Sequence, residues 1–262
     1  MLYNITMDKP RSKISKIIIA TIVIVMICVT IVLSLLTTQR KTETVSDGGL
    51  PVPELAEGIR GSQFGIDKNI NESTIDRYLG RDDAVYRDLR MLKDPGNYEA
   101  IGGDSYLSGF IDGFEIVPYP YIINPTGLPD EVGESYTGVA LFTDDAGNYR
   151  PNYVESLQIL EDLFPKDKYI FLMCGGGGYA GAMKNLLVSL GWDADKIYNV
   201  GGHWYYDGEH NVAVKAERDG ETVYDFWKVP YHDIDFSTLT EVEAEWKSAA
   251  TSLLSQLVLL LF

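Results

Sequence analysis

The longest uninterrupted hydrophobic stretch of the chain lies near its N-terminus. Residues 17–36 run for twenty positions without a charged side chain. At about 1.5 Å of rise per residue, a helix of this length matches the ~30 Å hydrocarbon core of a bilayer. A cleaved signal peptide is disfavoured, because the run is long for its hydrophobic region and no small residues mark a cleavage site before residue 37. The pattern therefore predicts a transmembrane helix over 17–36.

The charges on either side of this stretch predict its orientation. Four basic side chains lie within residues 1–16, and two follow the span, at Arg40 and Lys41. Because positively charged flanks tend to stay in the cytoplasm, residues 1–16 are expected to be cytoplasmic and the rest of the chain extracytoplasmic. Residues 37–63 are rich in turn formers, which predicts a linker between this single-pass span and a folded domain.

Beyond the linker, hydrophobic runs of strand length alternate with helical periodicity. The strand-like runs are at 84–90, 114–122, 168–173 and 196–200. Between some of them, apolar residues recur at the spacing of a helix. This alternation predicts an α/β domain in which a parallel sheet is flanked by helices, and we place it at residues 64–208.

Two helices are predicted on either side of the third strand. The first is capped by Asn152, and the second ends at Gly191, since glycine often terminates a helix. The apolar stripe of the first consists of Val154, Leu157, Leu160 and Phe164, and that of the second of Met183, Leu186, Leu187 and Leu190. Both stripes are expected to be the buried faces of their helices.

The C-terminal part of the chain follows a different pattern. Residues 209–240 predict a β-hairpin extension, in which Asp219 and Gly220 suit a turn that requires positive φ at both central positions. Residues 241–262 end in an apolar run that is too short to span a bilayer and too apolar to be left in water. Docking on the domain, lying in the membrane surface and being a non-native extension are equally compatible with this tail.

Composition and charge narrow the functional classes. The 262 residues are 45% hydrophobic, enough for one core with accessory elements. Residues 42–262 carry 16 basic and 37 acidic side chains, and this negative surface argues against a nucleic-acid partner. The three His and two Cys are scattered without metal-ligand spacing, so no metal or other cofactor is expected.

The residue with the most chemical potential is Cys174. It ends a strand-like run and is followed by glycines at 175–178 and by a helix start. Helix N-termini offer unpaired amide donors and can lower a thiol pKa from ~8.5 into the range of ~3.5–7.5. The pattern therefore predicts a nucleophilic thiolate in a ring of amides. Cys28 lies within the apolar span, so the remainder of the chain has no partner for an intrachain disulfide.

Two other interpretations compete with a nucleophile. A buried, unreactive Cys is common and fits the spacing equally well. Nucleotide binding is suggested by G-x-G-x-x-G at Gly176, Gly178 and Gly181. A dinucleotide site also needs an acidic residue at the end of the next strand to bind the ribose, and that strand ends in "YNVGG". Nucleotide binding is therefore disfavoured.

Several motifs together resemble the rhodanese family. The loop is similar to the family's C-x-x-G-x-R-S, with Cys174 and Gly177 matching but Tyr179 and Ala180 in place of Arg and Ser. "YRDLR" resembles the D-x-R that ends an early strand, and "SGFIDGFEIVP" resembles a G-H-I-P-G-A segment. "NVGGHWYY" resembles a glycine pair followed by Trp204. The resemblance covers about residues 71–207, and the ordered set is more specific than any one motif.

The resemblance implies a rhodanese-like sulfurtransferase anchored in the membrane. Cys174 would be the catalytic residue, accepting sulfur from a small donor as a persulfide and passing it to a thiol or to an acceptor like cyanide. The implied substrate-binding residues are Gly175, Gly176, Gly177, Gly178 and Tyr179, and the supporting residues are Asp88, Arg90 and His203. Asp88 and Arg90 are expected to form a structural ion pair near the loop.

The departures from the family pattern limit these expectations. An anionic donor such as thiosulfate gains from a loop arginine, because charge-assisted hydrogen bonds are roughly twice as strong as neutral ones. Tyr179 supplies only a hydroxyl, so a less charged persulfide donor is favoured over thiosulfate. Phosphatases of the related fold end a longer loop in Arg, and Ala180 argues against that activity. A non-catalytic module that binds a small anion or a partner protein is the alternative.

Overall fold

The computed structural model describes residues 49–54, 64–93, 106–123 and 139–242. The chain divides into two compact units, Met1–Val52 and Pro53–Phe262, and every named helix and strand belongs to the second. The predicted transmembrane helix at 17–36 lies outside the described residues, as do residues 1–16 and the tail from 243 onward. Within the described residues, no helix combines the length and the apolar character needed to cross a bilayer.

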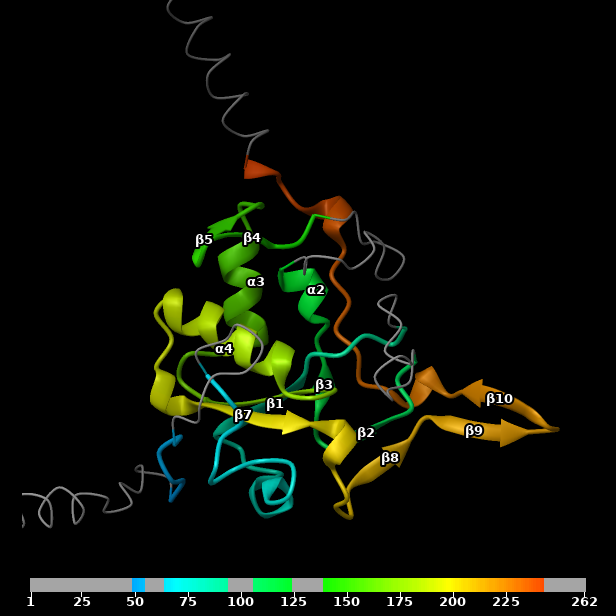
Figure 1. Cartoon of the computed structure of the whole chain (residues 1–262). Coiled ribbons are helices and arrows are strands. Elements are labelled where there is room, and N and C mark those ends of the chain that lie inside the picture. Colours follow the sequence, from blue (N-terminus) through cyan, green and yellow to red (C-terminus); the bar gives the residue numbers. More distant parts are fainter. Residues whose placement is uncertain (1–48, 55–63, 94–105, 124–138, 243–262) are drawn as a thin grey trace, which may run out of the picture. The chain divides into compact units, whose positions relative to one another are not determined.

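The centre of the second unit is a parallel sheet of four strands in the order β3-β1-β6-β7 (Figure 1). The strands are β1 (Ala84–Asp88), β3 (Glu115–Ile116), β6 (Tyr169–Cys174) and β7 (Ile197–Gly202). Each pairs in parallel with its neighbour. The prediction of an α/β domain with a parallel sheet is therefore confirmed. The carboxyl ends of β1, β6 and β7 meet at one edge, where such sheets place functional residues.

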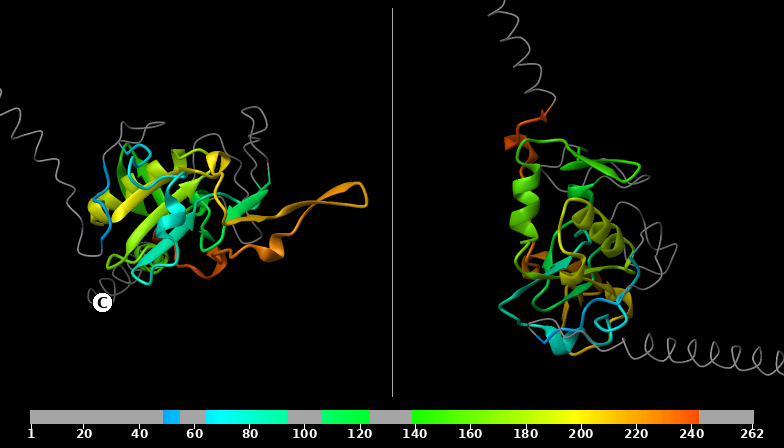
Figure 2. Two further views of the ribbon diagram at one scale, coloured as in Figure 1. Left: turned by 90° about the horizontal axis from the view of Figure 1, so that it is seen from below. Right: turned by 90° about the vertical axis from the view of Figure 1, so that its left-hand side faces the viewer.

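The two faces of the sheet are covered differently. Helices α2 (Tyr119–Ile122), α3 (Ser156–Leu163) and α4 (Gly178–Ser189) lie on one side (Figure 1). The other side is covered by residues 64–82, whose regular structure is the short 3-10 helix Ile75–Tyr78 (Figures 1 and 2). Described helices thus flank one face, and an irregular segment covers the other.

The alternation of side chains along the strands builds two separate cores. Ile170, Leu172 and Cys174 belong to the cluster that packs against the helices. The alternate residue Phe171 stacks on Tyr86 with a centroid distance of 5.1 Å and on Tyr198 at 4.9 Å. This aromatic row lies on the face covered by residues 64–82. Both faces being buried explains why β6 is apolar along nearly its whole length.

The basic residue in β1, Arg87, has partners that the sequence did not reveal. Its Nε donates to the carbonyl of Leu163 at 2.8 Å, and its Nη1 contacts the carboxylate of Glu115 at 2.6 Å. Arg87 and Glu115 are register partners in β1 and β3. A guanidinium in a buried strand is tolerated here because the edge strand supplies its counter-charge.

The predicted helix stripe at 154–164 is partly wrong. Leu160 and Phe164 are fully buried, but Val154 is 51% exposed and Leu157 48% exposed. The helix begins at Ser156, and its buried residues are Ser156, Leu160 and Leu163. Val154 precedes the first turn, so it does not follow the periodicity of the helix. The stripe of the second helix is largely confirmed, with Met183, Leu186 and Leu187 fully buried.

Asn152 does not cap the helix either. Its Nδ2 donates to the carbonyl of Ala140 at 2.8 Å, and its Oδ1 accepts from the Thr143 hydroxyl at 2.8 Å. These bonds tie it to a hairpin formed by β4 (Phe142–Asp145) and β5 (Asn148–Pro151). Competition from tertiary partners therefore overrides the local preference of asparagine for a helix start.

The run at 114–122 forms less strand than its apolar sequence predicts. Only Glu115–Ile116 pairs with β1, and the chain then turns into α2 at Tyr119–Ile122. Pro120, the second residue of α2, favours this change, because its fixed φ suits the first turn of a helix.

The predicted C-terminal hairpin is confirmed. Strands β9 (Lys215–Arg218) and β10 (Glu221–Tyr224) pair antiparallel and extend beyond the sheet (Figure 2). Asp219 has φ 55° and Gly220 has φ 84°, as a two-residue turn of this type requires. The hairpin follows β8 (Asn211–Ala213), which pairs with β2 (Gly109–Ile111).

Candidate functional site

Cys174 is the last residue of β6 and lies at the carboxyl edge of the sheet. Its side chain points to the helix-covered face, and the residue is 3% exposed. The chain then turns through Gly175, Gly176 and Gly177 before α4 begins at Gly178. Gly177 occupies the N-cap position with φ +84°, a left-handed conformation that glycine adopts without steric cost. The predicted order of strand, cysteine, glycine loop and helix is confirmed.

The turn directs a backbone donor toward the sulfur. The amide of Gly177 donates to Cys174 Sγ at 3.1 Å. The backbone amides of Ala180, Gly176 and Tyr179 also favour the charged form of the thiol. The ring of main-chain donors predicted at this helix N-terminus is therefore present.

The predicted lowering of the thiol pKa is wrong in direction. Burial raises the pKa of Cys174 above its ordinary value, and the nearby carboxylate of Asp88 acts in the same sense. The backbone amides oppose this rise without reversing it. The free-energy cost of removing a thiolate from water is larger than the stabilisation that these amide hydrogen bonds provide. The resting side chain is consequently a neutral thiol.

The glycines of the loop are required by close packing against the following strand. A Cβ atom on Gly175 would lie 2.6 Å from the ring of Trp204, and one on Gly202 would lie 2.2 Å from the carbonyl oxygen of Gly175. The amide of Trp204 also donates to the Gly175 carbonyl at 3.2 Å. Trp204 therefore covers one side of the loop, although it was not among the site residues predicted from the sequence.

Asp88 and Arg90 form the expected ion pair at the end of β1. The Arg90 guanidinium contacts both carboxylate oxygens, with Nε 3.0 Å from each. The side chain of Asp88 is fully buried and that of Arg90 is 12% exposed. Arg90 also donates to the carbonyl of Gly109 at 2.8 Å. The pair thereby fixes β2 to the carboxyl edge of β1, beside the loop.

His203 lies close to this ion pair. Its Nε2 is 2.9 Å from Asn211 Oδ1. Burial, followed by the positive charge of Arg90, lowers the pKa of His203 to about 4. The imidazole is therefore neutral near pH 7, and it supplies no positive charge that would stabilise a thiolate at Cys174.

Tyr179 occupies the loop position where the resemblance places an arginine. Its ring stacks on Tyr119 with a centroid distance of 4.9 Å and an interplanar angle of 25°. Tyr119 is buried in the core, and burial raises the pKa of its phenol. The first turn of α4 thus presents an aromatic ring, stacked on Tyr119 of α2, instead of a guanidinium.

Asn199 is a further residue of the site that the sequence did not single out. It lies within β7 and is 1% exposed. Its Nδ2 donates to the Gly177 carbonyl at 3.1 Å, and its Oδ1 accepts from the amide of Gly201 at 3.1 Å. The available signal was a polar residue in the otherwise apolar run "KIYNV".

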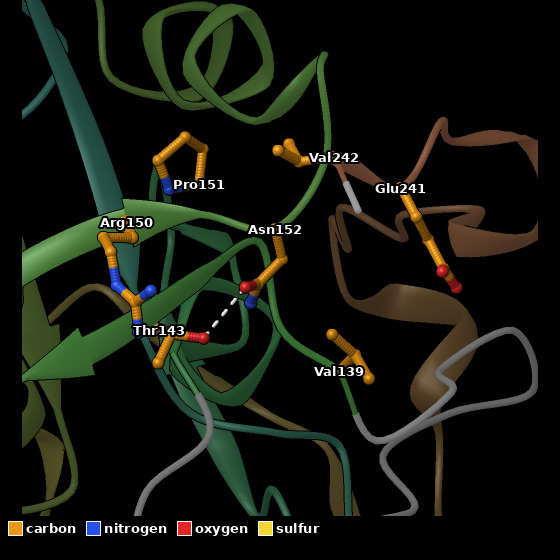
Figure 3. A pocket seen from close by; sticks show the side chains of 7 residues that line it. All are labelled: Val139, Thr143, Arg150, Pro151, Asn152, Glu241 and Val242. Carbon is orange, nitrogen blue, oxygen red and sulfur yellow. Dashed lines mark hydrogen bonds between the residues drawn. The ribbon is translucent and has the colours of Figure 1, made fainter. Parts of the chain in front are cut away.

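A separate pocket of about 550 Å³ lies beside the β4–β5 hairpin (Figure 3). Its lining includes Val139, Arg150, Asn152 and Glu241, but not Cys174. A hydrogen bond joins Thr143 and Asn152, which both line the pocket (Figure 3). In the part of the chain that the structure describes, no cluster of three His, Cys, Asp or Glu side chains could hold a metal ion.

Comparison of the chain with protein-family models, with curated proteins and with solved structures finds no match.

Proposed function

We propose that the protein is a membrane-tethered, rhodanese-like sulfurtransferase that carries sulfur as a persulfide on Cys174. The observation that supports this most directly is the position of the sulfur. It lies at the carboxyl end of a central parallel strand, 3.1 Å from the amide of Gly177 and next to the N-terminus of α4. A group added to this sulfur would extend toward amide donors and the positive end of a helix dipole.

In the proposed reaction, the Cys174 sulfur attacks the terminal sulfur of a donor R–S–SH. The new bond joins Cys174 to that sulfur, the bond between the two donor sulfurs breaks, and the products are R–SH and the Cys174 persulfide. The Cys174 thiol proton is transferred to the departing thiolate. A thiol acceptor then attacks the outer sulfur and regenerates Cys174. The amides around the loop would stabilise the anionic persulfide.

The surroundings favour a donor of low charge. Tyr179 and Tyr119 form the aromatic pair at the start of α4, and Arg90 is already paired with Asp88. Thiosulfate carries two negative charges and would gain little from a phenol compared with a guanidinium. We therefore expect alkyl persulfides to transfer sulfur to Cys174 more readily than thiosulfate does.

A non-catalytic module is the second candidate function. The observation that favours it is the burial of Cys174, which raises the thiol pKa and reduces the thiolate fraction. In that case the loop amides would bind a small anion, or the domain would bind a partner protein, without sulfur transfer. The two candidates differ in whether Cys174 gains a sulfur atom.

Intact mass spectrometry of the full chain in detergent separates the two candidates. After incubation with a small alkyl persulfide and removal of excess reagent, we expect a mass gain of one sulfur atom that cyanide or a thiol reverses. The gain should be absent in Cys174→Ala and retained in Cys28→Ala. A chain that gains no sulfur, or a gain that persists in Cys174→Ala, would exclude the enzymatic proposal.

A further inference from the structure

Asn199 is a polar side chain in the middle of a buried parallel strand. It is 1% exposed, and its register partner in β6 is Leu172, two residues before Cys174. Burying a carboxamide is unfavourable unless its donor and acceptor are both satisfied. The bonds that satisfy Asn199 therefore show what the residue holds in place.

Both bonds of the carboxamide reach the backbone around the loop. The Nδ2 group donates at 3.1 Å to the carbonyl of Gly177, which also accepts the first backbone bond of α4 from Gly181 at 3.0 Å. The Oδ1 atom accepts at 3.1 Å from Gly201. One side chain thus connects the N-terminus of α4 to the end of β7.

The backbone at both ends of this bridge is irregular. Gly177 has φ +84° and Gly201 has φ +100°. The register between β6 and β7 shifts between Leu172 and Met173, because Met173 pairs with Gly201 instead of Val200. Irregular backbone of this kind interrupts regular hydrogen bonding. The Asn199 carboxamide supplies a partner to the Gly201 amide and a second donor to the Gly177 carbonyl.

Residues 64–82 also contact Asn199 and Gly177, from the face of the sheet opposite the helices. The amide of Asp67 donates to the carbonyl of Asn199 at 2.8 Å. A Cβ atom on Gly177 would lie 3.0 Å from Cγ1 of Ile66, which shows how closely that side chain packs on the loop. Asn199 is therefore fixed through its backbone while its side chain fixes Gly177.

We propose that Asn199 is the positioning residue that aims the Gly177 amide at the Cys174 sulfur. The carbonyl of Gly177 is held by Nδ2, the left-handed conformation of Gly177 follows, and its amide then points at Sγ at 3.1 Å. The role deepens the proposed function, because the same amide would face a persulfide on Cys174.

The test measures the titration of Cys174 in the full chain. The rate of alkylation by iodoacetamide is followed against pH, and peptide mass spectrometry separates Cys174 from Cys28. Asn199→Leu keeps the number and branching of the side-chain heavy atoms and removes both hydrogen bonds. In this variant the pH midpoint of the alkylation rate is expected to rise by about one pH unit or more. A lost bond to a charged group has an effect of this order.

Asn152→Leu is the matched control. Asn152 also accepts at Oδ1 and donates from Nδ2 to a backbone carbonyl, but its partners are Thr143 and Ala140. Loss of the Asn152 carboxamide should lower the unfolding temperature and leave the pH midpoint of Cys174 alkylation unchanged. If Asn199→Leu does not fold, Asn199→Ser replaces it, since a hydroxyl is too short to bridge Gly177 and Gly201. A folded Asn199 variant with the wild-type midpoint would overturn the proposal.

The two proposals fail separately. If wild-type Cys174 gains no sulfur but its midpoint rises in Asn199→Leu, the positioning role stands and sulfur transfer does not. If Cys174 gains sulfur and the pH midpoint of its alkylation is the same in the wild-type protein and in Asn199→Leu, sulfur transfer stands and the positioning role is wrong.

Discussion

At the scale of single residues, the two buried charged side chains of β1 each have a counter-charge close by. Arg87 and Asp88 are adjacent in β1, and their side chains go to different faces of the strand. Arg87 pairs with Glu115 at the sheet edge, and Asp88 pairs with Arg90 beside the loop. Because the carboxylate of Asp88 is fully buried, its stability depends on the guanidinium that faces it.

Replacing Arg90 with glutamine is expected to destabilise the fold strongly. The change leaves the Asp88 carboxylate buried without a counter-charge, which costs about 3–5 kcal/mol. Arg81→Gln is the control, because its pair with Asp83 is more exposed, with side chains 26% and 48% accessible, and is worth less than about 1 kcal/mol. Urea unfolding followed by circular dichroism measures both. Similar losses in the two variants would show that the Asp88–Arg90 pair has no special importance.

At the scale of elements, the site depends on how a turn and a helix meet the strand next to them. The glycine loop is confined between Trp204 on one side and Ile66 on the other. Its conformation is thus set by β7 and by residues 64–82 as well as by the loop sequence. Two glycines with the same φ separate these contributions, because one is crowded and the other is not.

Gly177→Ala should destabilise the protein more than Gly220→Ala. Both glycines have φ +84°, so each alanine is strained by roughly 1–2 kcal/mol. The Cβ at 177 would also lie 3.0 Å from Ile66, whereas nothing lies within 4 Å of one at 220. Overpacking adds about 1–3 kcal/mol. The difference between the urea unfolding midpoints of the two variants measures this overpacking contribution. Equal midpoints would mean that the contact with Ile66 relaxes without cost.

At the scale of the whole molecule, an acidic α/β unit follows a strongly apolar N-terminal segment in the sequence. The segment at 17–36 and the flanking charges predict a tether with an extracytoplasmic domain. This prediction concerns residues outside those that the structure describes, so it is tested on the protein in its membrane.

The full chain is expected to stay with the membrane fraction after an alkaline wash, and a chain lacking residues 1–41 should be released. Twenty uncharged residues make insertion effectively irreversible compared with surface binding. Protease added to intact cells should remove the domain. A domain that is cut only after lysis would show that the orientation is reversed, whereas release of the full chain by the wash would show that 17–36 does not span.

Much of the fold could be predicted from the sequence because the relevant signals are local. The apolar run that forms β6, the periodicity of α4 and the Asp219-Gly220 turn each reflect the preferences of nearby residues. Predictions failed where contacts with segments distant in the sequence override local preferences. Asn152 is hydrogen-bonded to the β4–β5 hairpin and does not cap the helix. Val154 is exposed because the helix begins after it, at Ser156.

The same division holds for the candidate site. The sequence by itself determined that one cysteine ends a strand, that glycines follow it, and that Asp88 and Arg90 lie near enough to pair. Only the tertiary structure decided the protonation of Cys174, because desolvation depends on everything that packs around the sulfur. It also decided the roles of Trp204 and Asn199, whose contacts with the loop cross from one strand to the next. Such contacts depend on strand order and register, which no local pattern encodes.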